Sequence, residues 1–313
     1  MRAASRRLVA VVSAAVLVLV ALVGAPPEQA MAANTETFRE QLKTNAVAGQ
    51  SADGGGINVN GDIVTIGNNL MSCVPNQNTA YNTKCRQQWD GSNGYNNDFD
   101  MRYLDVDSDA ATFNSSMASL ALPDGANVLW AGLYWGSRGG SATATHATHS
   151  MSFKTPGSTA YTKVTADRYM GPNTTSSNAY QGMVDVTGML RARQSSAGTA
   201  NGDYWGANVT GTQGYDQYAG WSLVVAYEAP GLPLRNLTLF DGFNVVDQGK
   251  PISVTVSGFL APKTGPVDAS LTMVAYEGDA YLTGDYARLD SAQMASAITQ
   301  GTNFFNSNKG ERP

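Results

Sequence analysis

The sequence predicts an all-β protein: an antiparallel β-sandwich or jelly roll with long loops rich in Gly, Asn and Ser, and few short helices. Three observations support this fold class. Short β-branched and aromatic segments recur along the chain, turn-forming residues separate them, and patterns of helical period are scarce. Charged residues make up only 14% of the chain and 33 residues are glycine, which disfavours coiled coils and helical bundles.

The N-terminus has the parts of a secretory signal. Arginines precede an apolar stretch from Leu8 to Val23, and Ala30-Met31-Ala32 is a cleavage site of small residues. We expect residues 1–32 to be removed after Ala32, so that the protein is secreted, either extracellular or associated with the cell surface. The apolar stretch is shorter than the roughly 20 residues that cross a bilayer as a helix. We therefore expect no stable membrane span after cleavage.

The rest of the chain divides by composition. Residues 33–56 are polar and end in three glycines, which predicts a flexible leader with one short helix around 37–43. Residues 57–307 form the predicted β-sandwich region, either one extended sandwich or two smaller ones. A Pro-rich segment near residue 230 is then either a boundary or a loop, and residues 308–313 are a short tail.

The first strands are predicted at Ile57-x-Val59 and Ile63–Ile66, joined as a hairpin that turns at Asn60-Gly61. Further short apolar segments predict strands at Met117–Leu122, Val128–Trp135, Tyr161–Val164, Met183–Val186, Trp221–Tyr227, Leu237–Phe240, Ile252–Val256 and Leu271–Tyr276. Two short helices are expected, at Asp185–Arg193 and Ser291–Thr299.

The only cysteines are Cys73 and Cys85. An oxidising exterior favours a disulfide between them, with two free thiols as the alternative. A metal site is disfavoured because it would need more thiols or histidines nearby.

The charge pattern excludes one class of partner. With 20 basic and 25 acidic residues the net charge is −5, and no run of Lys or Arg could neutralise a row of phosphates. We expect no binding to nucleic acid.

An acidic cluster is the candidate metal site. Alternating carboxylates resemble the first half of a calcium loop, because calcium prefers several oxygen ligands held by a tight turn. Ala110 and Ser116 stand where an EF-hand would have Gly and Glu. The cluster is therefore either a calcium site of another kind, the only cofactor that the sequence suggests, or a solvated acidic loop: Asp98, Asp100, Asp105, Asp107 and Asp109.

Aromatic residues give the candidate ligand-binding site. Aromatic rings beside amide and carboxylate groups suit a sugar-binding surface, which needs both apolar stacking and hydrogen bonds. Four such residues are expected in loops of a Gly-rich stretch, and we assign them to ligand binding: Tyr204, Trp205, Tyr215 and Tyr218. The remaining large aromatic residues on predicted strands are assigned to the core: Trp130, Trp135 and Trp221.

A hydrolase is the alternative function. The tetrapeptide Val-Ala-Tyr-Glu occurs twice, and a glycosidase needs two carboxyl groups about 5 to 10 Å apart. The candidate carboxyls are Glu228, Glu277, Asp241 and Asp279. The only histidines are His146 and His149, which lie in a Ser/Thr/Ala-rich segment and lack the spacing of a zinc protease. A serine or cysteine hydrolase is also disfavoured, because its general base would have to be one of these two histidines.

Several segments together resemble a known kind of bacterial protein. They are Gly61–Cys73, Asn97–Ser115, Val128–Gly136, Gly220–Glu228, Leu232–Phe243 and Asn303–Ser307. They resemble the β-rich N-terminal head region of large secreted bacterial surface proteins that carry tandem immunoglobulin-like repeats. The resemblance implies an adhesin-like surface role and supplies no catalytic residues. Such proteins continue beyond the position of Ser307, so we expect either a stand-alone form or a shortened product. The cell-wall anchor of such proteins is therefore not assigned to this chain.

Taken together, the residues and the resemblance predict a secreted, surface-associated binding or structural module without enzymatic activity. Its expected partner is a cell-surface glycan or protein.

Overall fold

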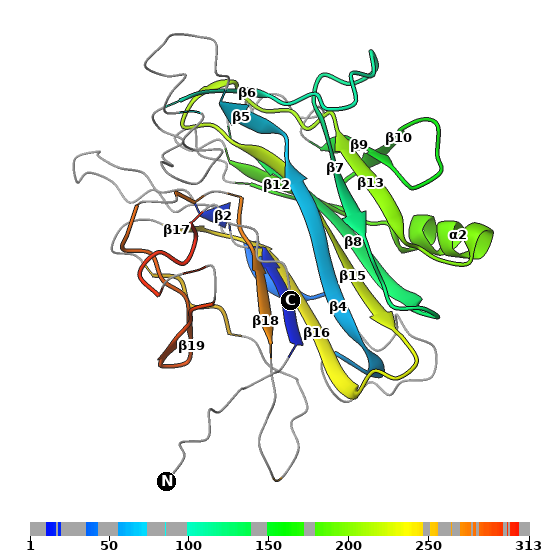
Figure 1. The fold of residues 1–313 in the computed structure, drawn as a ribbon. Helices are drawn as coiled ribbons and strands as arrows, with labels where there is room; N and C mark the ends of the chain where they lie inside the picture. The colour runs from blue at the N-terminus through cyan, green and yellow to red at the C-terminus, as the bar shows by residue number, and fades with distance from the viewer. Residues whose placement is uncertain are drawn as a thin grey trace.

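The computed structural model describes residues 11–16, 18–19, 36–42, 56–73, 85, 99–138, 149–171, 179–246, 251–255, 264, 270–276, 278–279, 282–296, 299 and 301–306. The fold is all-β and consistent with a sandwich, as the sequence predicts (Figure 1). The N-terminal strands β1 (Val11–Val16) and β2 (Val18–Leu19) lie within the predicted signal sequence.

The largest sheet has nine strands (Figure 1). In spatial order they are β11 (Arg168–Met170), β12 (Tyr180–Asp185), β8 (Asn127–Ser137), β15 (Ala219–Glu228), β4 (Ile57–Asn69), β16 (Leu234–Phe243), β1 and β18 (Leu271–Val274), with β3 (Glu36–Glu40) also paired to β16. Pairing is antiparallel from β11 to β16, whereas β1 runs parallel to both β16 and β18.

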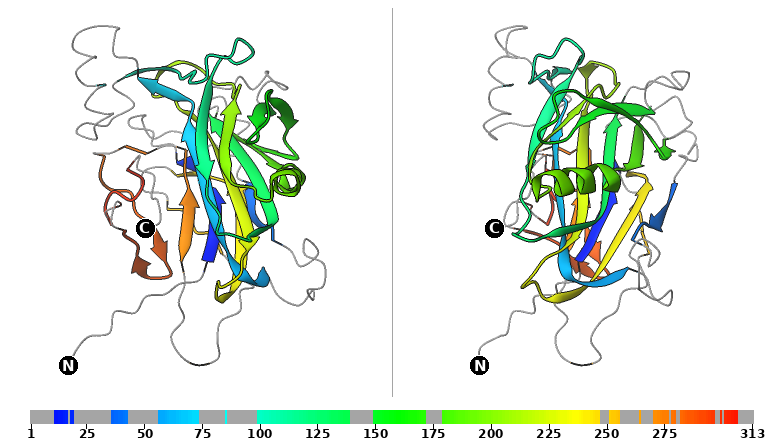
Figure 2. Two further views of the ribbon diagram at one scale, coloured as in Figure 1. Left: turned by 45° about the vertical axis from the view of Figure 1, so that its right-hand side comes forward. Right: turned by 90° about the vertical axis from the view of Figure 1, so that its right-hand side faces the viewer.

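A four-stranded antiparallel sheet packs against one face of the large sheet, which we call the sandwich face (Figure 2). Its strands in order are β10 (Thr162–Thr165), β9 (Ser150–Lys154), β13 (Gly202–Ala207) and β7 (Ser115–Leu120). The helix α2 (Thr187–Ala197) lies across the strands and buries Leu190 in the same core (Figure 2). It agrees with the helix expected at Asp185–Arg193.

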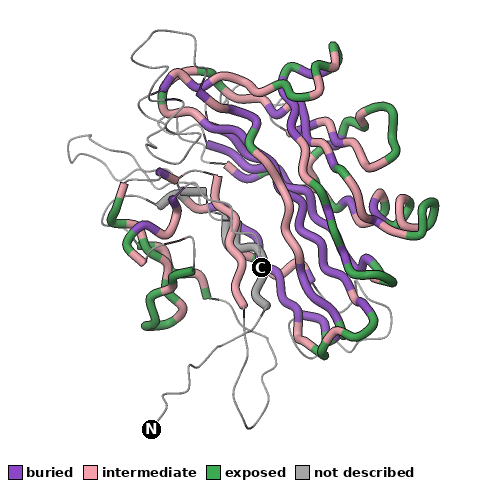
Figure 3. Tube along the Cα trace, in the orientation of Figure 1, coloured by how far each residue is buried: buried purple, intermediate pink, exposed green. Residues whose placement is uncertain are grey.

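The main core lies between these two sheets. Phe153 of the small sheet packs edge-on against Trp221 of the large sheet, with ring centroids 6.2 Å apart, and stacks on Tyr204 at 5.7 Å. Burial is continuous along β8 and β15 (Figure 3). Trp130, Trp135 and Trp221 are all buried, which confirms their assignment to the core.

The opposite face of the large sheet, which we call the rear face, carries a second apolar cluster. Along β8 the side chains alternate, so that Leu133 and Trp135 join the sandwich core while Tyr134 joins the rear cluster. Tyr276 covers part of the rear face: a Cβ on Gly136 would lie 3.2 Å from its ring, and a Cβ on Gly220 would lie 3.7 Å from it. The ring of Tyr276, which follows β18, thus packs over β8 and β15 near the centre of the sheet.

The remaining strands are short. A three-stranded sheet is formed by β14 (Gly214–Tyr215), β6 (Asp100–Tyr103) and β5 (Met71–Cys73). Two further pairs are β17 (Val245–Val246) with β2, and β19 (Arg288–Leu289) with β20 (Ala292–Gln293).

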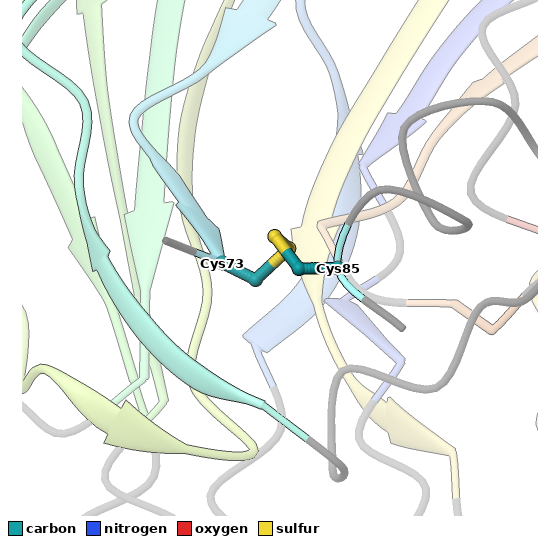
Figure 4. The surroundings of a disulfide bond; sticks show 2 residues. All are labelled: Cys73 and Cys85. Carbon is teal, nitrogen blue, oxygen red and sulfur yellow. A yellow bond between two sulfur atoms is a disulfide. The ribbon is translucent and has the colours of Figure 1, made fainter. Parts of the chain in front are cut away.

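The disulfide between Cys73 and Cys85 is present, as the sequence predicts (Figure 4). Both cysteines are buried beside Phe99 and Met101 in a third, small apolar cluster. The disulfide therefore secures the end of β5 against a residue twelve positions further along the chain.

The hairpin expected at Asn60-Gly61 is wrong, because Ile57–Asn69 is one continuous strand. Its first residues pair with β16 and the others, from Gly61 onward, with β15. Gly61 allows a close backbone approach: a Cβ there would lie 2.0 Å from the carbonyl oxygen of Tyr227. Because β4 pairs with both β15 and β16, the Pro-rich segment near 230 is a connection within one sheet.

Other segments also differ from expectation. Residues 36–40 form β3 rather than part of a flexible leader with a short helix. This strand pairs with residues 240–243 of β16, whereas β4 pairs with residues 234–237. The prediction of a helix at residues 291–299 is wrong for the described part of that segment, because Ala292–Gln293 is a strand. Residues 251–255 carry no strand assignment, although Ile252–Val256 was expected to be one.

Candidate functional site

The aromatic residues assigned to ligand binding do not form one surface. Tyr204 and Trp205 lie on β13 rather than in a loop, and successive side chains of a strand point to opposite faces. Tyr204 is fully buried and its hydroxyl donates to the carbonyl of Ala200 at 2.7 Å, so it is a core residue. Tyr218 is also buried, whereas Tyr215 is 54% exposed and Trp205 is half-buried.

Trp205 lies beside a charged residue of the neighbouring strand β9. The Lys154 ammonium lies 5.0 Å from the Trp205 ring centroid and 4.4 Å from the Tyr161 ring centroid. Such cation–π contacts hold a lysine head over aromatic faces. The cause is the pairing of β9 with both β13 and β10, which places Lys154 between the two rings.

Asp107 joins this group from the acidic loop. Its Oδ2 accepts a hydrogen bond from the Tyr161 hydroxyl and lies 3.7 Å from Lys154 Nζ. We call these four residues the Trp205 patch: Trp205, Lys154, Tyr161 and Asp107. It combines a half-buried aromatic ring with fixed charged and hydroxyl groups on the small sheet.

The Asp107 carboxylate is held in its ionised form. Burial raises its pKa, but hydrogen bonds from Tyr161, Ser115, the Asp109 N–H and Thr112 outweigh burial and lower the pKa to about 2. In turn, burial, the hydrogen bond to Asp107 and the nearby acidic charges raise the pKa of Tyr161. The patch therefore keeps a carboxylate next to an un-ionised phenol at neutral pH.

The carboxylates assigned to calcium are split by the structure. Asp98 lies outside the described residues, and Asp100 is on β6, ion-paired with Arg102. Asp105 and Asp107 do come together, because their Oδ1 atoms lie 2.9 and 2.8 Å from the hydroxyl of Ser115.

Asp109 takes part in the same loop. Its carbonyl oxygen accepts the Thr112 hydroxyl at 2.9 Å, and its Oδ1 accepts the N–H of Ala111. Over the part of the chain that the structure describes, no group of three or more His, Cys, Asp or Glu residues is arranged to hold a metal ion.

The carboxyls of the hydrolase alternative are also dispersed. Glu277 lies outside the described residues, Asp279 is buried, and Glu228 accepts a hydrogen bond from Asn127 at the end of β15. Glu228 pairs with Gly61 of β4, and Leu234 pairs with the adjacent Asn60, so Glu228 and Leu234 are at the same level of the sheet. Asp241 is seven residues further along β16 than Leu234. At about 3.3 Å per residue, Glu228 and Asp241 are about 23 Å apart along the strands, too far for a glycosidase pair.

Asp241 instead belongs to a buried polar network on the rear face. It is fully buried and ion-paired with Arg168, and it accepts hydrogen bonds from Gln41 at 2.7 Å and from the Tyr134 hydroxyl at 3.1 Å. Burial raises the pKa of Asp241, and the Arg168 charge and these hydrogen bonds oppose that rise. The network links β8, β11 and β16 with Gln41, the residue that follows β3.

The Arg168–Asp241 pair also shows that the sheet is curled. In a flat sheet β11 and β16 would be about 24 Å apart, because five strand spacings separate them. Their ion pair is possible only because the sheet bends toward its rear face, in the shape of a half-barrel (Figure 2).

Sequence reasoning missed Lys154 and Tyr161. The register of β9 and β10 pairs Phe153 with Thr162, so the next positions out, Lys154 and Tyr161, lie opposite each other. Pro156-Gly157 between two alternating segments is a hairpin signal that could have identified this pair.

Comparison with protein families, with curated proteins and with solved structures finds no match to this chain. Within the described residues, none of the helical structure has both the length and the apolar character needed to cross a bilayer.

Proposed function

We propose that the protein is a secreted, surface-associated binding module, adhesin-like in role, and that the Trp205 patch contacts a cell-surface carbohydrate. The observation that carries this proposal is the half-buried Trp205 ring with Lys154, Tyr161 and Asp107 fixed beside it. Sugars present apolar C–H faces and hydroxyl groups, which an aromatic ring and fixed polar groups can contact together.

Binding rather than hydrolysis is supported by the same geometry. The patch has one carboxylate with a low pKa, whereas a retaining or inverting glycosidase needs a second carboxyl that can donate a proton. The separation of Glu228 and Asp241 removes one pair of the hydrolase alternative. A protein partner instead of a glycan is an outcome that the experiment below distinguishes.

The test is an array of glycans and bacterial cell-wall polymers, run beside a hydrolysis assay on the same ligands. Trp205→Ala should weaken binding about tenfold or more, as for an aromatic residue at the centre of a contact. Tyr286→Ala is the matched control, because Tyr286 is 42% exposed and also lies beside a cation, Arg288 at 4.7 Å.

Unchanged binding by Trp205→Ala would contradict the assignment of the patch. Release of hydrolysis products by the wild-type protein would replace the binding proposal with the hydrolase alternative. If Trp205→Ala keeps the melting temperature of the wild type, any loss of binding comes from the missing ring and not from unfolding.

We also propose that calcium binds at the acidic loop, where Asp105 Oδ1 and Asp107 Oδ1 face the same hydroxyl of Ser115. Two carboxylates that share one hydroxyl partner repel each other, and a divalent cation relieves that repulsion. Calcium should raise the melting temperature relative to a chelator, and Asp105→Asn should remove the rise. Equal melting temperatures in both buffers would rule out the calcium site.

A further inference from the structure

The strand β16 has two edges with different partners. The carbonyl of Leu239 accepts a hydrogen bond from the Gln41 N–H after β3, and a Cβ on Gly56 before β4 would lie 2.4 Å from the carbonyl of Leu237. Residues 237 and 239 point their backbone groups to the same edge, because alternate residues of a strand do so. The strands β3 and β4 therefore share one edge of β16.

The strand β1 pairs with residues 237–239 on the other edge, which we call the acceptor edge. Further along the chain, β2 pairs with β17. Both β1 and β2 belong to residues 1–32, which the sequence predicts to be removed on export. Loss of these residues would expose the acceptor edge, and an unpaired edge beside buried apolar side chains is a template for another strand.

Residues 251–255 have the character of a strand, although none of the described strands pairs with them. Ile252 and Val254 are half-buried, whereas Pro251, Ser253 and Thr255 are exposed. This alternation, continued by Val256 in the sequence, is the pattern of a half-buried strand.

The sequence also fixes a register for this segment. Asp247-Gln248-Gly249-Lys250 separates it from β17, and either a two-residue turn at Gln-Gly or a four-residue loop pairs residue 246 with 251. Ile252 is then opposite Val245, and Val254 is opposite Phe243, which is fully buried in the rear cluster.

The register is consistent over the whole segment. Ile252 and Val254 are opposite Val245 and Phe243, and Leu237, Leu239 and Phe243 belong to the rear cluster. Both apolar residues of 252–255 therefore point to the apolar rear face. A shift of one residue would turn both of them away from it, so the face constrains the register.

We propose that the acceptor edge is a strand-binding site whose occupant in the exported protein is residues 252–255 of the same chain, paired antiparallel with residues 242–245. The signal sequence pairs with residues 237–239 through β1 and with residues 245–246 through β2, so this segment can pair with the edge only after residues 1–32 are removed. The new strand would lie between β16 and β18. This inference depends on the predicted cleavage and not on the binding function.

The first test uses the full chain, exported and purified from the medium, with its N-terminus determined by intact mass. In Asn244→Cys/Ser253→Cys the two residues are directly opposite in the proposed register, at a Cα separation of about 5 Å. Asn244→Cys/Thr255→Cys is the matched control, because its residues are two positions out of register, about 7 to 8 Å apart. Disulfide mapping should show at least about a fivefold higher yield for the first pair.

The second test needs no substitution. Hydrogen exchange of the exported wild-type protein should show slow amides over residues 242–245 and 252–255, because these two segments would be paired with each other. Equal crosslinking of the two cysteine pairs, rapid exchange over both segments, or an exported protein that retains residues 1–32 would each overturn the proposal. None of these readouts depends on whether a glycan binds.

Discussion

At the scale of single residues, Asp241 is a carboxylate placed where water cannot reach it. A buried ion pair contributes little compared with apolar side chains of the same volume, but loss of one partner is costly. Arg168, Gln41 and Tyr134 come from different elements and all bind this one side chain. The network therefore specifies how these elements meet more than it adds stability.

We predict that Arg168→Met lowers the free energy of unfolding by about 3 to 5 kcal/mol at pH 7, because it leaves the Asp241 charge buried without its cation. The pKa of Asp241, already raised by burial, should rise further. A carboxyl whose pKa is higher in the folded than in the unfolded state stabilises the fold below its unfolded pKa and loses that effect as pH rises through its folded pKa. The deficit should therefore shrink from pH 7 toward pH 4.

Denaturant unfolding of the variant and the wild type at both pH values measures this. The double variant Arg168→Met/Asp241→Leu is the control, and it should recover most of the loss because no charge remains buried. A deficit that is the same at pH 7 and pH 4 would contradict the role assigned to Asp241.

We predict the opposite pH dependence for Asp107, whose pKa is lowered to about 2. Its hydrogen bonds stabilise the fold above the unfolded pKa, and that contribution is lost as pH falls from about 4 to about 2. Tyr161→Phe removes one donor and should raise the pKa of Asp107 and destabilise the protein by about 1 kcal/mol. Carboxyl NMR titration measures the pKa, with Tyr286→Phe as a control that should leave it unchanged.

At the scale of elements, glycines make room for the large aromatic rings of the core. A Cβ on Gly182 of β12 would lie 2.3 Å from the Trp135 ring, and a Cβ on Gly206 of β13 would lie 2.5 Å from the Trp221 ring. Each glycine stands opposite a ring from another strand or sheet. Gly182 leaves room for the ring of its cross-strand partner, and Gly206 lets the small sheet approach the large one closely.

We predict that Gly182→Ala destabilises the protein by about 1 to 3 kcal/mol, because the Trp135 ring is fully buried and has no space to move. Gly188→Ala in α2 is the control: nothing lies within 4 Å of its Cβ position, so alanine should stabilise the helix by up to about 1 kcal/mol. Thermal unfolding of both variants checks the signs. Equal effects of the two substitutions would mean that ring contact does not decide the cost.

The same contacts explain which elements the sequence could predict. The strands β8 and β15 are long, apolar and bounded by turn residues, and they were predicted in place. The strand β13 was missed because Gly-Asp-Tyr-Trp-Gly-Ala has no β-branched residue, and its Gly206 is explained by a ring more than ten residues away in the sequence. Gly61 was interpreted as a turn residue for the same reason, since its close approach to Tyr227 is a long-range contact.

The candidate site was predictable to a similar extent. Trp205 and Asp107 were named from residue type alone, because aromatic rings and clustered carboxylates are visible in any sequence. Tyr204 was wrongly included with them, since strand alternation, and not residue type, decides that it points into the core. Trp205 meets Lys154 because β13 pairs with β9, which is distant in the sequence, and no local pattern reports that pairing.

At the scale of the whole molecule, the buried apolar residues that the structure describes are divided among three clusters that differ greatly in size. The two large clusters share the nine-stranded sheet and should unfold together. The small one, formed by Cys73, Cys85, Phe99 and Met101, lies at the three-stranded sheet and has the disulfide as its centre (Figure 4). Its stability should therefore depend on the disulfide more than on apolar burial.

This division predicts the result of replacing both cysteines with serine. The disulfide closes a loop whose entropy cost in the unfolded chain corresponds to about 3 kcal/mol of stabilisation. We expect this stabilisation to be confined to the strands next to the loop, β5 and β6. Amides of β5 and β6 should exchange faster in the double variant, whereas amides of β8 and β15 should keep their wild-type protection, because their cores do not contain the disulfide. Hydrogen exchange with mass spectrometry resolves the two regions. A uniform loss of protection over all of these strands would mean instead that the small cluster and the sandwich form one cooperative unit, with the disulfide stabilising both.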